Sequence, residues 1–193
     1  MNGKRKKLNG FSLGEVLLSV SVLTVGVLPV MAAMTKGFQS SLASRDVIVA
    51  SGLAQEGAEL VKNVKDNNVL AGSASLSAWL PSSGSTWNDC RIDAGDQVLS
   101  PGNRISCGLS ASAFKLSKQS SNFLGHGGAG VATKFSRKIL LDYGGSGNER
   151  VTCISAVYWG QSYTPSSIAD ARANCKVSKK CVYAESVLTP WGS

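Results

Sequence analysis

The sequence predicts an α+β fold, in which a long N-terminal α-helix packs its second half against a C-terminal antiparallel β-sheet. Three features predict this arrangement. Residues 16–35 are apolar and carry no formal charge, which is enough chain to cross a hydrocarbon core of about 30 Å as a helix. Residues 36–68 continue with helical periodicity. Two strand-like segments between residues 133 and 159 are separated by a glycine-rich turn signal, as in a β-hairpin.

The N-terminal charges set the expected membrane topology. The chain has 193 residues and a formal net charge of +8, and half of that charge comes from Lys4, Arg5, Lys6 and Lys7. Positive residues favour the cytoplasmic side of a membrane. Residues 1–10 are therefore predicted to lie on the cytoplasmic side of the inner membrane, with the head outside.

The apolar segment is expected to remain in the protein. A secretory signal peptide would have a shorter apolar region followed by a small-residue cleavage site, and this run continues without a clear site of that kind. Residues 11–35 are predicted to be a single transmembrane helix in contact with membrane lipid.

The next part of the helix, residues 36–68, is predicted to be amphipathic. Its apolar residues recur at steps of four and seven and would share one side of the helix, namely Phe38, Leu42, Val49, Leu53, Leu60 and Val64. Pro29 is expected to kink the helix because it removes a backbone donor, and Asn67 and Asn68 are expected to end it. The polar side would face solvent or a neighbouring subunit and carries Gln55, Glu56, Glu59 and Lys62.

Residues 69–193 are predicted to form a globular, β-rich head. Ser and Gly dominate residues 71–87 and indicate a loop. The strongest strand predictions are 133–143 and 149–159, joined by GGSGN as a hairpin, followed by a third strand at 181–191 and weaker candidates at 91–93, 103–107 and 113–116. Alternation in 149–159 would put Val151, Cys153, Ser155, Val157 and Trp159 on one face and Ile154, Ala156 and Tyr158 on the other.

The five cysteines would lie in an exported head, where disulfides form. The preferred pairs are Cys90–Cys107 and Cys175–Cys181, because each would close a loop rich in polar or turn residues, and Cys153 would stay free and buried within a strand. The alternative is that all five are reduced. No pair has the Cys-x-x-Cys spacing and His126 is the sole histidine, so neither a metal site nor a cofactor is predicted.

The segment GHGGAG, residues 125–130, matches the dinucleotide-binding pattern G-x-G-x-x-G. It leads into a strand-like segment rather than a helix, and the pattern has meaning only within a strand–turn–helix unit. The prediction is therefore a flexible loop with a solvent-exposed His126. No other residues suggest catalysis, and the protein is not predicted to be an enzyme.

The segment GFSLGEVLLSVSVL, residues 10–23, resembles the processing and methylation signature of type IV prepilins and the related secretion pseudopilins. That signature has a basic leader ending in Gly, then Phe or Met, an apolar helix, and Glu as the fifth mature residue. The resemblance implies that residues 1–10 are a basic leader peptide. It also implies that a prepilin peptidase cuts between Gly10 and Phe11 and methylates the new amine of Phe11. Residues 50–68, and the segments VTCISAVYWG and VLTPW near the C-terminus, resemble parts of minor pilins.

Glu15 is the costliest residue of the apolar segment, because an ionised group at the edge of a bilayer loses hydration. A buried carboxylate needs a partner, and cleavage would create a positive amine at Phe11, about 6 Å along the helix. In the family, this Glu is thought to meet the terminal amine of a neighbouring subunit. Glu15 is accordingly predicted to be an assembly contact, and the alternative is a signal-anchor helix that tolerates one acid near its end.

The function expected from this resemblance is that of a minor pilin, a structural subunit of a type IV pilus-like filament. Its partners would be the prepilin peptidase, other pilin subunits and the pilus assembly machinery. It would reside in the inner membrane before joining an extracellular filament. One alternative is a pseudopilin of a type II secretion or DNA-uptake system. The other is a single-pass anchored binding protein that does not polymerise.

DNA binding is the less favoured interpretation of the basic residues of the head. They could form a patch whose DNA affinity falls as salt rises, made of Lys115, Lys118, Lys134, Arg137, Lys138, Lys176, Lys179 and Lys180. No aromatic residues are interleaved with them, as binding of single strands would favour. A solvated surface is therefore the preferred interpretation.

Overall fold

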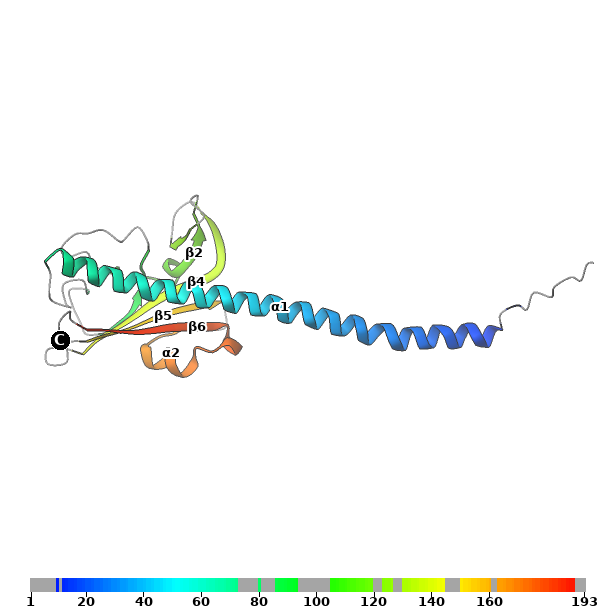
Figure 1. The fold of residues 1–193 in the computed structure, drawn as a ribbon. Coiled ribbons are helices and arrows are strands. Elements are labelled where there is room, and N and C mark those ends of the chain that lie inside the picture. The colour runs from blue at the N-terminus through cyan, green and yellow to red at the C-terminus, as the bar shows by residue number, and fades with distance from the viewer. Residues whose placement is uncertain are drawn as a thin grey trace, which may run out of the picture. The chain divides into compact units, whose positions relative to one another are not determined.

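A computed structural model describes residue 10 and residues 12–72, 80, 86–93, 105–119, 123–126, 130–144, 150–160 and 163–189. The chain divides into two compact units, Met1–Arg45 and Asp46–Ser193. Helix α1, Leu13–Leu70, begins in the first unit and ends in the second. The second unit adds an antiparallel sheet and a short helix, so the fold belongs to the α+β class, as predicted (Figure 1).

Helix α1 continues through Pro29 and extends two residues past the predicted end. The side chain of Asn68 is buried and donates a hydrogen bond to the carbonyl of Val64, 2.8 Å away, so Asn68 supports the helix rather than ending it. The chain leaves the helix at Gly72, whose φ of +93° is the left-handed conformation typical of helix C-termini. The amide of Gly72 donates to the carbonyl of Val69.

Within the described residues, the sheet has six strands in the order β3-β2-β4-β5-β6, with β1 also paired to β4. All pairs are antiparallel. The thirteen-residue strand β4 is long enough to pair first with β2 and then with β1. The strands are β1 (Thr86–Cys90), β2 (Lys115–Lys118), β3 (Leu124–His126), β4 (Val131–Tyr143), β5 (Val151–Trp159) and β6 (Cys181–Leu188).

The strongest strand predictions are confirmed. Strands β4 and β5 pair in unbroken register from Phe135 opposite Trp159 to Tyr143 opposite Val151. Strand β6 lies within the predicted segment 181–191 and pairs with β5. The predicted turn GGSGN, residues 144–148, lies outside the described residues apart from Gly144.

Several weaker predictions are wrong or incomplete. The segment 103–107 contributes, in its described part, one isolated bridge between Ser106 and Arg91 rather than a strand. The segment 113–116 is divided between a 3₁₀ helix, η3 (Ala111–Phe114), and β2. The segment 91–93 likewise contributes only the bridge at Arg91. Strands β1 and β3 were not predicted, and β1 begins within the predicted loop 71–87. Helix α2 (Ile168–Asn174) and the 3₁₀ helix η4 (Val177–Lys179) were not predicted either.

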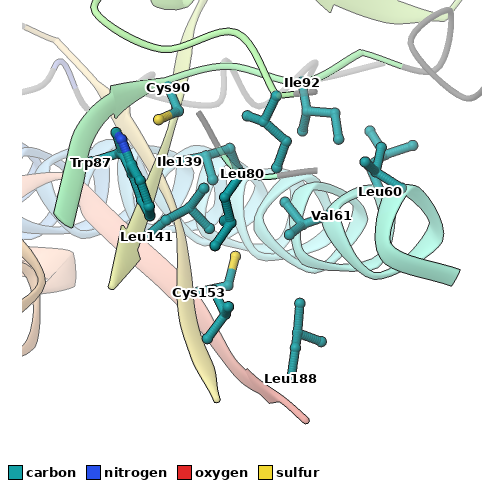
Figure 2. Packing of buried hydrophobic residues seen from close by; sticks show 13 residues of the cluster. Leu60, Val61, Leu80, Trp87, Cys90, Ile92, Ile139, Leu141, Cys153 and Leu188 are labelled. Carbon is teal, nitrogen blue, oxygen red and sulfur yellow. The ribbon is translucent and has the colours of Figure 1, made fainter. Parts of the chain in front are cut away.

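The two faces of the sheet are covered by different helices. Residues of the last part of α1 pack with alternate residues of β5, such as Val61 with Cys153 and Leu53 with Val157. Figure 2 shows one of these clusters, in which α1, β4 and β5 converge with the segment around β1. On the opposite face, Ile154 and Ala156 of β5 pack with Ile168 and Ala171 of α2, joined by Leu140 of β4. The predicted alternation of β5 is therefore present, and both of its faces are buried.

Two disulfides are present, and they are the two pairs preferred from the sequence. Cys90–Cys107 joins the end of β1 to the segment before η3. Cys175–Cys181 joins the C-terminus of α2 to the start of β6. Cys153 is free and buried on β5.

Candidate assembly helix and head

The first part of α1 presents a continuous apolar surface. It is long and apolar enough to cross a membrane, by length and composition. Its large apolar side chains are exposed by between 39% and 79%, and a soluble protein rarely leaves so large an apolar surface uncovered. These residues are Leu13, Val16, Leu17, Leu18, Val20, Val22, Leu23, Val25, Val27, Leu28, Val30, Met31 and Met34. This surface therefore needs a covering of lipid or of other apolar helices.

The hydroxyl groups of this segment are paired within the helix itself. Ser19 and Thr35 donate to the carbonyls four residues before them, and Ser21 and Thr24 to the carbonyls three residues before them. Hydrocarbon offers no partner to a polar group, so each one must be satisfied internally. The four hydroxyls meet that requirement and leave the outer surface of the helix apolar.

Glu15 lies in the first turn of α1, where its side chain is exposed. Its carboxylate forms no hydrogen bond or ion pair with any residue that the structure describes. The carbonyl of Ser12 accepts hydrogen bonds from the amides of Glu15 and Val16, at 3.0 Å and 3.3 Å. Ser12 and Glu15 thus have the Ser-x-x-Glu spacing of a capping box, and a negative charge here is favourable to the helix dipole. Glu15 therefore has a local structural reason as well as its predicted role in assembly.

The predicted processing site is described only in part. Gly10 is exposed, while Phe11 and the basic residues 4–7 lie outside the described residues. Cleavage after Gly10 and methylation of Phe11 therefore stay predictions.

Within the head, one buried guanidinium joins the last part of α1 to the sheet. Arg137 lies on the central strand β4 and is 0% exposed. Its Nη1 donates to the carbonyl of Leu53 and lies 3.1 Å from Oε1 of Glu56, both on α1. Its Nη2 donates to the carbonyl of Ile92, 2.9 Å away. Because a buried charge is costly without partners, these contacts favour one placement of α1 on the sheet.

Asp93 and His126 extend this network to the edge of the sheet. Oδ1 of Asp93 lies 3.8 Å from Nη2 of Arg137 and 2.7 Å from Nδ1 of His126. Nε2 of His126 lies 3.0 Å from the carbonyl oxygen of Arg137. Burial by itself raises the pKa of Asp93, but hydrogen bonds and charge from His126 and the charge of Arg137 outweigh it and hold that pKa below its ordinary value.

The predicted exposure of His126 is wrong. His126 is buried and lies on β3, where it pairs with Leu116 of β2. Gly125 and His126 of the glycine-rich segment therefore belong to a strand and not to a loop. Residues 127–129 lie outside the described residues.

The less favoured interpretation, a DNA-binding patch of eight basic residues, loses two of the eight in the structure. Arg137 is buried in the network just described, and Lys138 is only 5% exposed. Nζ of Lys138 donates to the carbonyl of Pro165 at 2.9 Å and lies 2.8 Å from Oδ1 of Asp89. These two cations therefore hold the fold together and are not available to DNA.

No family model matches the chain, and comparisons with curated proteins and with solved structures found no match. The function of the protein is therefore inferred from the exposed apolar part of α1 and from the folded head.

Proposed function

We propose that this protein is a minor pilin-like structural subunit of a type IV pilus-like filament. In this role, residues 11–35 hold it in the inner membrane, a prepilin peptidase cuts between Gly10 and Phe11, and the apolar part of α1 then packs among the same helices of other subunits. The single observation that carries the proposal is the uncovered apolar surface of α1, joined in one helix to a disulfide-linked α+β head.

The division of α1 into two chemically different parts supports this role. From Leu13 to Met34 the helix exposes its large apolar side chains, whereas from Ala50 to Val64 it buries residues against the sheet. A subunit that must leave a membrane and enter a filament needs an apolar segment that either environment can cover. It also needs a head that stays folded during the transfer, and the buried Arg137 and two disulfides favour that.

The mass of the N-terminal peptide tests the proposal. The full chain is purified from membranes of cells with and without a prepilin peptidase. A chain that begins at N-methylated Phe11 only when the peptidase is present supports the pilin class. Gly10→Val is the control, because a branched side chain beside the cleaved bond should leave the leader attached in both kinds of cell.

A leader that is retained in both kinds of cell would overturn the proposal. The protein would then be a signal-anchored binding protein that does not polymerise. A processed chain that is found in secretion or DNA-uptake filaments, and not in pili, would instead make it a pseudopilin.

A further inference from the structure

A groove on the head gathers cations and hydroxyl groups outside the network around Arg137. It has a volume of about 540 Å³ and is lined by Lys115 and Lys134 together with the side chains of Ser112, Ser136, Tyr158 and Thr164. None of the described residues that line it is Asp or Glu. A second groove, between α1 and β6, differs in that it contains Glu59 and Glu185. The first groove, called here the lysine groove, is therefore suited to a negatively charged ligand.

Lys180 adds a third cation at the rim of the lysine groove. An ideal Cβ on Gly160, a lining residue, would lie 3.3 Å from Cδ and 3.6 Å from Nζ of Lys180. The aliphatic part of Lys180 thus lies directly over Gly160. A side chain at position 160 would crowd it, and the φ of +77° at Gly160 also favours glycine.

The backbone of Lys180 ends the 3₁₀ helix η4. Its φ of 54° and ψ of 45° place it in the left-handed region, and it is the one non-glycine residue with positive φ in the described part of the chain. The left-handed region is common at helix C-termini, where glycine adopts it without steric cost, and the amide of Lys180 donates to the carbonyl of Val177. This turn at the end of η4 leaves the ammonium group of Lys180 beside Gly160.

The charges of the groove are only partly neutralised by the protein. Lys134 forms an ion pair with Asp46 of α1. Lys115 and Lys180 are exposed and form no ion pair with the described residues. Two ammonium groups are therefore available to a ligand.

The hydroxyl groups of the groove can donate hydrogen bonds to an anion. The hydroxyl of Tyr158 interacts with the side chains of Thr164 and Ser136. The pKa of Tyr158 is raised chiefly by burial and also by the negative charge of Asp89, which is itself paired with Lys138. It therefore keeps its proton at neutral pH and remains a donor. Serine, threonine and tyrosine hydroxyls combined with ammonium groups match the several acceptor oxygens of a phosphate or sulfate.

We propose that the lysine groove binds an oxyanion of the phosphate or sulfate type, held by Lys115 and Lys180 and by the hydroxyls of Ser136 and Tyr158. The oxyanion is either free in solution or an ester on a sugar whose own hydroxyls contact the rest of the groove. This site is independent of filament assembly, because it requires only the folded head.

The test is an NMR titration of the ¹⁵N-labelled full chain in a neutral detergent, with inorganic phosphate, glucose 6-phosphate and glucose as separate probes. The expected result is saturable shifts at the amides of Lys115, Gly160 and Lys180 with both phosphates and not with glucose. Tighter binding of glucose 6-phosphate would assign the ester as the source, and equal binding would assign the free ion. Absence of saturable binding, or equal shifts with glucose, would overturn the proposal.

Variants with matched controls locate the site. Lys115→Gln and Lys180→Gly should each weaken phosphate binding about tenfold, as expected for loss of a charge-assisted hydrogen bond. Lys180→Gly relieves the left-handed backbone, so it should not lower thermal stability and its loss of binding would not reflect unfolding. Lys118→Gln, on the same strand as Lys115, and Lys176→Gln, in the same disulfide loop as Lys180, should bind as the unmodified chain does. An equal loss in all four variants would mean a diffuse electrostatic effect and would overturn the assigned site.

Discussion

Nη1 of Arg137, on the central strand of the sheet, lies 3.1 Å from Oε1 of Glu56 on α1. The two partners differ in environment, since the side chain of Arg137 is 0% exposed and that of Glu56 is 44% exposed. Replacement of Arg137 and replacement of Glu56 should therefore lower the free energy of unfolding by different amounts. The contact joins the helix that carries the apolar segment to the sheet that forms the head.

Replacement of Arg137 by Met should lower the free energy of unfolding by about 3 kcal/mol, because the carbonyls of Leu53 and Ile92 and the carboxylate of Asp93 lose their buried cation. Glu56→Gln is the matched change on the other side of the pair. It should cost below about 1 kcal/mol, because solvent screens a half-exposed carboxylate. Urea unfolding of the full chain in detergent, followed by tryptophan fluorescence, measures both. Equal costs would mean that Arg137 is stabilised chiefly by Glu56.

Gly57→Ala should destabilise the head, because the helix meets the sheet without space for a side chain there. A Cβ on Gly57 would clash with Oγ of Ser155 and would lie 2.9 Å from Cδ of Arg137. The expected loss is about 1–3 kcal/mol, typical of an overpacked core. Gly52→Ala, five residues earlier on the same helix, is the control. A Cβ there would meet nothing within 4 Å, so the variant should gain about 0.5–1 kcal/mol from helix propensity. Unchanged stability of Gly57→Ala would show that α1 can shift on the sheet.

The paired elements of this head were predictable where the local pattern and the tertiary structure agree. Strands β4 and β5 are rich in β-branched and aromatic residues and are separated by a short glycine-rich segment, so their pairing follows from the residues between 133 and 159. Helix α2 has seven residues, too few for a helical period to stand out in the sequence. Its start is marked by Ser167, whose side chain accepts from the amide of Asp170. That Ser-x-x-Asp capping pattern was the signal available for it.

The buried polar residues could not be located from sequence, because their partners come from distant parts of the chain. Arg137 contacts α1 and the segment after β1, and nothing near position 137 indicates those contacts. His126 lies in a glycine-rich segment that favours a loop, yet pairing of β3 with β2 buries it. The sequence indicates only a surface cation at Lys180. Its backbone conformation and its position over Gly160, which distinguish it from the other lysines of its loop, are visible only in the structure.

Asp93 should make the stability of the head depend on pH in acid. Its pKa in the folded protein lies below the ordinary value of 3.8, so the folded state binds fewer protons than the unfolded state near that pH. The stabilisation is present above about pH 4 and is lost as the pH falls through the folded pKa. Thermal unfolding of Asp93→Asn and of the unmodified chain, compared from pH 6 to pH 2, should give a difference that shrinks below about pH 4. A difference that is constant with pH would exclude this carboxylate as the source.

Cys153 should resist alkylation in the folded protein. It is buried, and its burial raises the pKa of the thiol to about 12, so both access and the reactive thiolate are lacking at pH 8. Treatment with N-ethylmaleimide should leave the mass of the native chain unchanged and add one label after unfolding without reductant. Unfolding with reductant should expose all five cysteines. Labelling of Cys153 in the native state, or more than one label before reduction, would contradict the buried thiol or the two disulfides.

Glu15 has two candidate roles, and one substitution separates them. In the first turn of α1 its negative charge is favourable to the helix dipole, typically by about 0.3–1 kcal/mol. As the proposed assembly contact, it needs its negative charge to meet the terminal amine of a neighbouring subunit. Glu15→Gln removes the charge from both roles, but loss of the dipole interaction is small and should leave membrane insertion unchanged, whereas loss of the proposed contact should lower entry into filaments.

The expected result is that Glu15→Gln inserts into the membrane at a normal level but enters filaments at least about tenfold less often than the unmodified chain, because a neutral amide loses the charge-assisted bond to the amine. Immunoblots of membrane and sheared-filament fractions measure both quantities. Glu59→Gln, which neutralises an exposed carboxylate on the head part of the same helix, should enter filaments normally. Normal incorporation of Glu15→Gln would show that entry into filaments does not need the charge of Glu15. The register of subunits would then have to come from packing of the apolar side chains of α1 alone.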